Sequence, residues 1–322
     1  MIFSDIPRVR LLTQETPLMP ARRYGQAIGC RDLWLKREDV MELGLGGNKI
    51  RSLEFWLGEA LAQGCDTILA AGLPVSNLCR LTAAACARLG LRCIVIHNAE
   101  EADQPARKTG NALLNELMGV ETVYCGKVDE NARAAFAVQL ACKLRGQGKK
   151  PYIIGDGCLG ALGYVASVLE LLQQADRLSL PLRHIFLSAS AGPTEAGVVY
   201  GLCLTGGKQK LHLISVEYER SVFLPIIEAL FEDLCQKLRC RPALSPRDVL
   251  EFHGDYLGAG YARPTAAAET ERLRMAQTEG IFLDSTYNAK VYAGLRDLIA
   301  RGELPAHETI CAYHTGGIPS VF

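Results

Sequence analysis

The sequence predicts an α/β protein in which parallel twisted sheets are covered by helices. Short apolar runs, typical of buried strands, alternate along the chain with longer stretches whose apolar residues recur at helical spacing. This alternation favours βαβ units, because parallel strands are usually connected through a helix. The number of units favours two sheets rather than one, and a chain of 322 residues usually divides into two domains.

Glycines and capping residues mark where the elements begin and end. Helical spacing over 53–61 predicts a helix that Gly64 ends, followed by a buried strand at 67–71. Ser76 and Asn77 cap a helix at 78–89, which ends at Gly90 before a strand at 93–96. The same rhythm then predicts helices at 111–118, 130–144, 161–174, 195–204, 266–277 and 289–301, and strands at 122–124, 152–154, 184–187, 211–216, 281–283 and 310–313. Ligands of such folds bind at the carboxyl ends of the strands.

The composition favours a small-molecule partner. Lysine plus arginine and aspartate plus glutamate both number 35, so no basic face for nucleic acid is indicated. No apolar stretch approaches the roughly 20 residues of a membrane span, and residues 1–7 lack the pattern of a signal peptide. The 12 cysteines are scattered without a Cys-x-x-Cys pair, which favours a reducing cytoplasm and predicts no metal site.

Two glycine-rich loops could bind a phosphate-bearing cofactor. The first, 44–51, exposes backbone N–H groups beside Lys49, although a helix-entry loop with a solvated lysine explains it equally well. The second, 155–160, has the Gly-x-Gly-x-x-Gly spacing of a dinucleotide site and follows a predicted strand. The acidic ribose partner of such a site is missing, because the next strand ends in Ser188-Ala189-Ser190.

Two further loops follow predicted strands. Loop 190–194 places backbone N–H groups and a threonine hydroxyl at a helix N-terminus, which predicts an anion site, although Pro193 removes one donor. Loop 313–317 contains two glycines that allow close approach to a ligand, with a tight turn as the alternative. His97 and His314, at strand ends, are candidate general bases or structural histidines. A serine-hydrolase elbow is absent from the sequence.

Several short segments occur in a fixed order along nearly the whole chain: Thr16-Pro17-Leu18, Leu35-Lys36-Arg37-Glu38-Asp39, Gly46-Gly47-Asn48-Lys49, Ser76-Asn77, Leu159-Gly160-Ala161-Leu162-Gly163-Tyr164, Thr194-Glu195-Ala196-Gly197, Asp284-Ser285-Thr286-Tyr287 and His314-Thr315-Gly316-Gly317-Ile318-Pro319. In this they resemble the D-cysteine desulfhydrase and 1-aminocyclopropane-1-carboxylate deaminase family, which is of the tryptophan-synthase-β type (fold type II) of pyridoxal-phosphate enzymes. The resemblance implies a large cofactor domain (1–51 and 164–322), a small mobile domain (52–163) and a homodimer.

The resemblance also implies roles for individual residues. Lys49 matches the lysine that binds pyridoxal phosphate covalently. The other cofactor-binding residues would be Asn48 beside it, Asn77 at the ring oxygen, Thr315 at the ring nitrogen, and Ala191, Gly192 and Thr194 at the phosphate. A small amino-acid substrate would contact Ser76, Asn77, Leu78, Tyr261 and Tyr287, and the catalytic residues would be Lys49, Ser76 and Tyr287.

The chain departs from the family pattern near these residues. Ser52 stands where the family often has a second lysine that helps to hold the phosphate, and Ala191 and Pro193 replace a serine and a glycine of the phosphate loop. Leu78 replaces a polar residue, which predicts a less polar substrate than D-cysteine. Asn288 replaces an acidic residue of the deaminase branch, which argues against opening of a cyclopropane ring.

The expected reaction is α,β-elimination from a small amino acid, which yields a 2-oxo acid and ammonia. β-Replacement and cyclopropane ring opening are alternatives within the same chemistry. Two other classes stay open: a catalytically silent binding module, suggested by Ser52, Pro193 and Leu78, and a nicotinamide-dependent oxidoreductase, suggested by loop 155–160.

Overall fold

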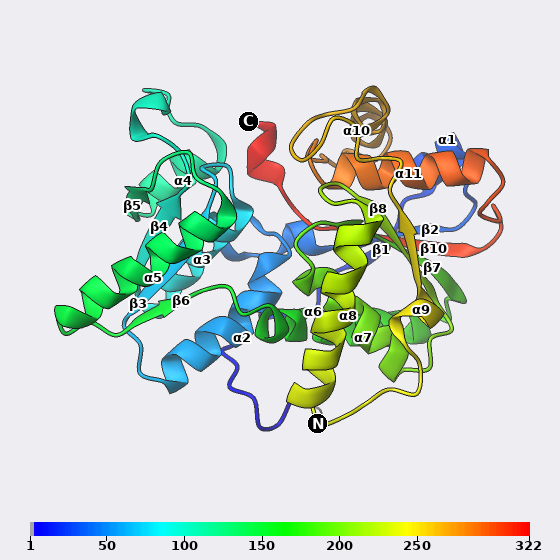
Figure 1. Ribbon diagram of the computed structural model, residues 1–322. Helices are drawn as coiled ribbons and strands as arrows, with labels where there is room; N and C mark the ends of the chain where they lie inside the picture. The colour runs from blue at the N-terminus through cyan, green and yellow to red at the C-terminus, as the bar shows by residue number, and fades with distance from the viewer. Residues whose placement is uncertain (1–2) are drawn as a thin grey trace.

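The protein contains two mostly parallel sheets with helices around them, as the computed structural model shows for residues 3–322 (Figure 1). The larger sheet has six strands in the order β1-β2-β10-β7-β8-β9, and the smaller has four in the order β5-β4-β3-β6. All neighbouring strands are parallel except β1 and β2. The predicted α/β class with two helix-covered parallel sheets is confirmed.

The larger sheet is covered by helices on both faces. Its strands are β1 (Leu18–Pro20), β2 (Leu33–Arg37), β7 (Leu182–Ala189), β8 (Lys210–Ser215), β9 (Leu250–His253) and β10 (Thr309–His314). One face packs with α6 (Gly157–Arg177), α7 (Pro193–Leu204) and α8 (Arg220–Lys237), and the short α9 (Pro246–Val249) precedes β9. The other face packs with α1 (Arg22–Ile28), α10 (Ala266–Glu279) and α11 (Asn288–Ala300). Alternate residues of one strand therefore enter different cores: Leu187 the first and Phe186 the second.

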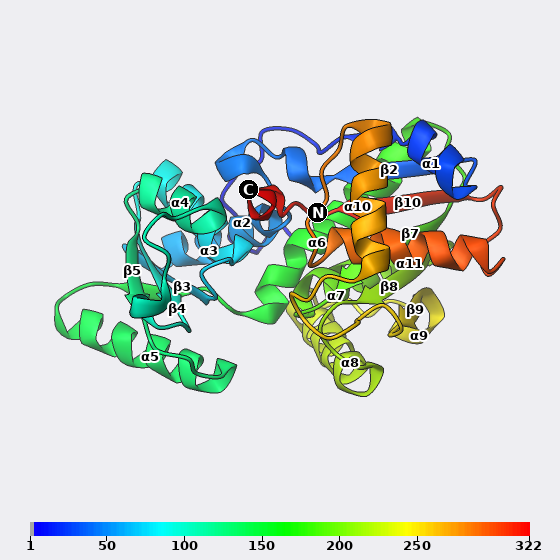
Figure 2. The same ribbon diagram turned by 90° about the horizontal axis from the view of Figure 1, so that it is seen from above.

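The smaller sheet lies beside the larger one, and the C-terminal segment runs between them (Figure 2). Its strands are β3 (Thr67–Gly72), β4 (Arg92–His97), β5 (Glu121–Tyr124) and β6 (Pro151–Ile153). Its helices are α2 (Lys49–Ala62), α3 (Asn77–Leu89), α4 (Gly110–Leu117) and α5 (Glu130–Gly146). The 3-10 helices are η1 (Glu38–Val40), η2 (Leu43–Leu45), η3 (Glu101–Asp103) and η4 (Ile318–Val321), and η4 packs on α4.

One strand prediction is wrong. Residues 281–283 form no strand, although Ile281 and Leu283 are buried in the core beside α10 and α11. The run lies between Gly280, which ends α10 in the left-handed conformation, and Asp284, which caps the next turn. The short segment between Gly280 and Asp284 therefore buries Ile281 and Leu283 without pairing with a strand.

The predicted division into residues 52–163 and the remainder stays a prediction. All four strands of the smaller sheet lie between 67 and 153. Both α2 and α6, however, run without a break across the predicted boundaries.

Helix α6 is, within residues 3–322, the one helix long and apolar enough to cross a membrane by length and composition. From the sequence we expected no apolar stretch of this length. In its most apolar window 67% of the residues are buried inside the protein, as in a core helix. Gly160 and Gly163 allow α6 to approach α2 closely, since an added Cβ would lie 2.3 Å from the Trp56 ring and 2.4 Å from the Arg51 backbone.

Candidate functional site

A cavity of about 250 Å³ lies where the carboxyl ends of strands from both sheets meet. Gly72 ends β3, Ser188 lies near the end of β7, and Thr315 follows β10. The N-termini of α2, α3 and α7 also reach the cavity. This is the position at which parallel α/β sheets bind ligands, as the sequence analysis expected.

Lys49 is the first residue of α2 and lines the cavity. The loop before it requires glycine, because Gly46 has φ 68° and an added Cβ would lie 1.9 Å from the Asp39 carbonyl oxygen. The N–H of Asn48 donates to the Thr315 carbonyl at 2.9 Å, which ties the start of α2 to the end of β10. The Lys49 Nζ and the Asn48 Nδ2 each lie 3.4 Å from the Thr194 Oγ1.

Carboxylates that were not among the predicted site residues also line the cavity, and two of them, Glu195 and Glu217, act on the Lys49 amine. Burial lowers the pKa of the Lys49 amine, and the negative charges of Glu195 and Glu217 oppose this shift without cancelling it. Burial in turn raises the pKa of both carboxyls. The amine therefore releases its proton more easily than a surface lysine, and neutral amine is the nucleophilic form.

Loop 190–194 joins β7 to α7 at the opposite wall. No hydrogen bond within residues 3–322 uses the N–H groups of Ala191 or Thr194, whereas the N–H groups of Ser190 (at 2.7 Å) and Gly192 are directed at the Glu195 carboxylate. Pro193 occupies the first turn of α7, where a missing N–H costs no helical hydrogen bond. The loop thus retains donors for an anion at a helix N-terminus.

Gly192 has a different position from its loop neighbours. It does not line the cavity, and its φ of 102° and the 2.7 Å that would separate an added Cβ from Ile226 both require glycine. It packs on Ile226 and Leu230 of α8.

Ser76, Asn77 and Leu78 line the cavity from the N-terminus of α3. The Ser76 hydroxyl caps the helix by accepting from the Cys79 N–H at 3.3 Å. The Asn77 Oδ1 accepts from Asn111 at 3.0 Å and from Arg80 at 3.4 Å. With its oxygen occupied, the Asn77 amide has its NH₂ group available to donate to a ligand.

Tyr261 and Tyr287 line the cavity and share a hydrogen bond between their hydroxyls. Burial raises the pKa of both phenols, so both are protonated at neutral pH. The Tyr261 loop is held by the buried Lys290, whose Nζ donates to the carbonyls of Leu257 at 2.8 Å and Gly260 at 3.1 Å.

Thr315 is fixed by Asn288, the first residue of α11. The Asn288 Oδ1 accepts from the Thr315 N–H at 2.9 Å and lies 3.3 Å from the Thr315 hydroxyl. The Asn288 Nδ2 donates to Asp284 at 2.6 Å and to the Gly316 carbonyl at 2.9 Å. The polar groups at this end of the cavity are therefore oriented by a buried amide.

The cavity brings together every predicted site residue except Gly192. It does not include the two candidate histidines. His97 is buried against the Gly72 carbonyl at 2.8 Å, and His314 against the Phe282 carbonyl at 2.8 Å. Both contacts are those of structural histidines. The Gly-x-Gly-x-x-Gly loop also lies outside the lining, and Gly160 serves the packing of α6 on α2.

Residues 9–316 match the protein family described as "Pyridoxal-phosphate dependent enzyme". The chain is 35% identical over 327 residues to a D-cysteine desulfhydrase of Klebsiella pneumoniae (99% of this chain, 97% of the relative). It is 32% identical over 330 residues to one of Serratia proteamaculans (99% and 96%).

Two solved structures share the fold. A crystal structure described as an ACC deaminase homologue has a TM-score of 0.89 and 32% identity, covering 100% of this chain and 95% of that chain. A threonine deaminase of Solanum lycopersicum has a TM-score of 0.67 and 16% identity (94% and 79%), which is a likeness of fold alone.

Proposed function

Because the chain belongs to the family of pyridoxal-phosphate dependent enzymes, we propose that it removes a β-substituent and the amine from a small amino acid. With one water consumed, the products are a 2-oxo acid, ammonia and the protonated β-substituent. The two bacterial relatives with about one third identity over nearly the whole chain are named D-cysteine desulfhydrases, which supports elimination. The single observation that carries the proposal is the position of the Lys49 amine. It lies 3.4 Å from the Thr194 hydroxyl of loop 190–194, in the same cavity.

The residues present fit the cofactor. Lys49 would bind its aldehyde carbon, and the free N–H groups of Ala191 and Thr194, together with the Gly192 N–H beside them, would hold its phosphate. The Asn77 NH₂ group would donate to the ring oxygen, and Thr315 would meet the ring nitrogen. When bound, pyridoxal phosphate withdraws electrons from the Cα of the attached amino acid.

The side chains would divide the proton transfers between them. Lys49, with its lowered pKa, takes the Cα proton and holds it at Nζ. Tyr287, protonated at neutral pH and hydrogen-bonded to Tyr261, donates a proton to the departing β-substituent. Ser76, at the N-terminus of α3, binds the substrate carboxylate.

The groups around Thr315 favour elimination over ring opening. The ring nitrogen would meet a hydroxyl fixed by a neutral amide, Asn288, rather than a carboxylate. A neutral partner would stabilise a protonated ring nitrogen less than a carboxylate would, and the bound group would then withdraw electrons less strongly. Prompt loss of a β-substituent would then be favoured over opening of a cyclopropane ring.

Apolar side chains favour a substrate that is less polar than D-cysteine. Leu73, Val75 and Leu78 line the cavity on the α3 side. Hydrogen bonds to a polar substituent are replaced there by apolar contact.

We further propose that the protein is a homodimer in the cytoplasm. Light scattering of the purified protein tests the dimer through its molar mass.

The reaction is tested by incubating the cofactor-loaded protein with small D- and L-amino acids that carry a β-leaving group. The expected result is equal release of 2-oxo acid and ammonia from at least one of them, and none from Lys49→Ala. A β-substituted product on addition of a thiol would indicate β-replacement instead. Cofactor binding without turnover of any amino acid would favour a silent module, and binding of NADH by a colourless protein would favour the oxidoreductase.

A further inference from the structure

Three histidines lie in a row on neighbouring strands of the larger sheet, away from the cavity lining. His184 lies on β7, His212 on β8 and His253 on β9. In the register, His212 is paired with Glu251, and His253 follows two residues later on the same face of β9. His212 also stacks on Phe186, with ring centroids 4.5 Å apart and planes inclined by 10°. Sequence reading could not find this cluster, because its members lie far apart in the chain.

The hydrogen bonds along the row define which nitrogen carries each proton. The His184 Nε2 lies 2.5 Å from the Glu308 carboxylate, to which it donates, so the His184 Nδ1 is an acceptor. The His212 Nε2, 2.9 Å from that Nδ1, is then the donor. The lone pair of His212 is consequently on Nδ1, which faces His253 and Glu251. His212 is thus oriented through its other nitrogen by His184, which the Glu308 carboxylate holds in turn. Hydrogen bonds to the non-coordinating nitrogen commonly orient metal-binding imidazoles.

The spacing of the three outer groups matches that of metal ligands. The His212 Nδ1 lies 3.1 Å from the His253 Nε2 and 3.4 Å from a Glu251 oxygen. All three ligand atoms lie within 4.8 Å of one another. Bonds of about 2.0–2.1 Å at tetrahedral angles place neighbouring ligands about 3.3–3.4 Å apart.

We propose that His212, His253 and Glu251 bind a divalent transition-metal ion, with zinc as the best fit. Two imidazoles and one carboxylate suit zinc better than calcium or magnesium, which prefer oxygen ligands. Glu251 has 47% of its side chain exposed, which gives the ion access from solvent and leaves room for water as a fourth ligand. Since β9 is the edge strand, the ion would fasten it to β8. This site is independent of the proposed reaction.

Calorimetric titration of the cofactor-loaded protein with ZnCl₂ tests the proposal. One equivalent is expected to bind with micromolar or tighter affinity and to raise the melting temperature. Glu251→Gln should weaken binding at least tenfold and His253→Gln at least a hundredfold. Both positions are at least partly exposed, so these variants should fold. His307→Gln, at an exposed histidine outside the cluster, should bind within twofold of the unaltered protein.

The 12 cysteines are the competing zinc ligands, and X-ray absorption at the zinc edge separates them. The proposal predicts nitrogen and oxygen neighbours at about 2.0–2.1 Å and no sulfur at about 2.3 Å. The proposal would be overturned by sulfur neighbours or by binding of less than one equivalent of zinc. It would also be overturned if Glu251→Gln and His253→Gln bound zinc as tightly as the unaltered protein. The three rings would then be a hydrogen-bonded row in which His253 donates to His212.

Discussion

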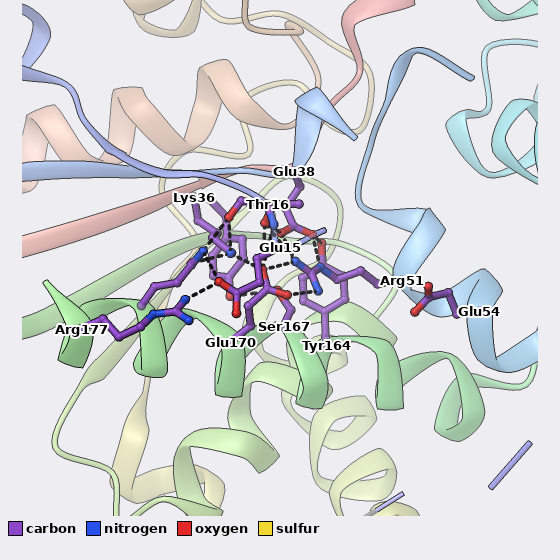
Figure 3. A network of polar contacts seen from close by, with 12 residues as sticks. Glu15, Thr16, Lys36, Glu38, Arg51, Glu54, Tyr164, Ser167, Glu170 and Arg177 are labelled. Carbon is purple, nitrogen blue, oxygen red and sulfur yellow. Dashed lines mark hydrogen bonds and ion pairs between the residues drawn. The ribbon is translucent and has the colours of Figure 1, made fainter. Parts of the chain in front are cut away.

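The guanidinium of Arg51 forms a bidentate ion pair with the carboxylate of Glu38, with Nε 2.6 Å from Oε2 and Nη2 2.9 Å from Oε1 (Figure 3). Both side chains are at most 2% exposed. Arg51 also donates to Glu170 on α6, and Lys36 on β2 contacts the same carboxylate at 2.5 Å. Arg51 follows Lys49 by two residues in α2, so this network fixes the helix that carries the amine.

Glu38→Gln should destabilise the protein by about 3 kcal/mol. The substitution removes one of the two carboxylates that pair with the buried Arg51 and leaves only Glu170. Equilibrium urea unfolding measures the change. Glu232→Gln removes one carboxylate of an exposed pair with Arg241 and is the matched control. Equal effects of the two substitutions would show that the buried pair has no special importance.

Glu170→Gln should have an effect that depends on pH. Burial alone would raise the pKa of Glu170, but its contacts with Arg51 and Lys36 outweigh burial and hold the pKa at about 2. A carboxyl whose pKa is lowered by folding stabilises the protein above its unfolded pKa and loses that contribution as pH falls toward the folded value. The difference in unfolding free energy should be about 3 kcal/mol at pH 7 and should shrink between about pH 5 and pH 2. A difference that stays constant from pH 7 to pH 3 would contradict this account.

Glu195→Gln should shift the pH dependence of cofactor binding. The charge of Glu195 raises the pKa of Lys49 against the effect of burial, so its removal lowers that pKa further. The rate at which cofactor-free protein takes up pyridoxal phosphate requires neutral amine. Its acidic limb should therefore move to lower pH. Glu219→Gln, at an exposed position, should not move it; a shift to higher pH in Glu195→Gln would refute the electrostatic role.

Asn288→Asp should destabilise the site although it changes one atom. The new carboxylate would face the Asp284 carboxylate and the Gly316 carbonyl in place of the two donated hydrogen bonds. We expect a loss of about 3 kcal/mol of stability and weaker retention of the cofactor, measured by thermal unfolding and dialysis. The exchanged pair Asp284→Asn with Asn288→Asp should recover part of the loss. An acidic residue here therefore requires a different neighbour at position 284.

The sequence predicted the fold where a local pattern determines it. The alternation of strands and helices is local, and so is the glycine loop before Lys49, where a Cβ at Gly46 would lie 1.9 Å from the Asp39 carbonyl oxygen. Strand β2 was not predicted, because Lys36 and Arg37 interrupt its apolar run; Lys36 is buried only because Glu170 and Gln174 contact it. The apolar run 281–283 was predicted as a strand, because burial without pairing leaves the same pattern.

The polar residues missed in the site come from contacts between distant segments. Glu195 belongs to the family-like segment 194–197, yet only the approach of α7 to α2 shows that its charge acts on Lys49. Glu217 follows β8 and belongs to no predicted loop motif. The partners of Arg51 lie on β2, η1 and α6, and the histidine row requires the register of three strands. The spacing of residues along the chain therefore predicts neither the Arg51 network nor the histidine row.

The most direct test of the central claim is the site of cofactor attachment. Borohydride reduction of the cofactor-loaded protein, followed by digestion and mass spectrometry, shows which lysine carries the phosphopyridoxyl group. The expected result is stoichiometric label on Lys49 and its loss in Lys49→Ala, with Lys290→Met, which alters the buried lysine of the Tyr261 loop, labelled as fully as the unaltered protein. Label on another lysine, or no label at all, would contradict the assignment of Lys49.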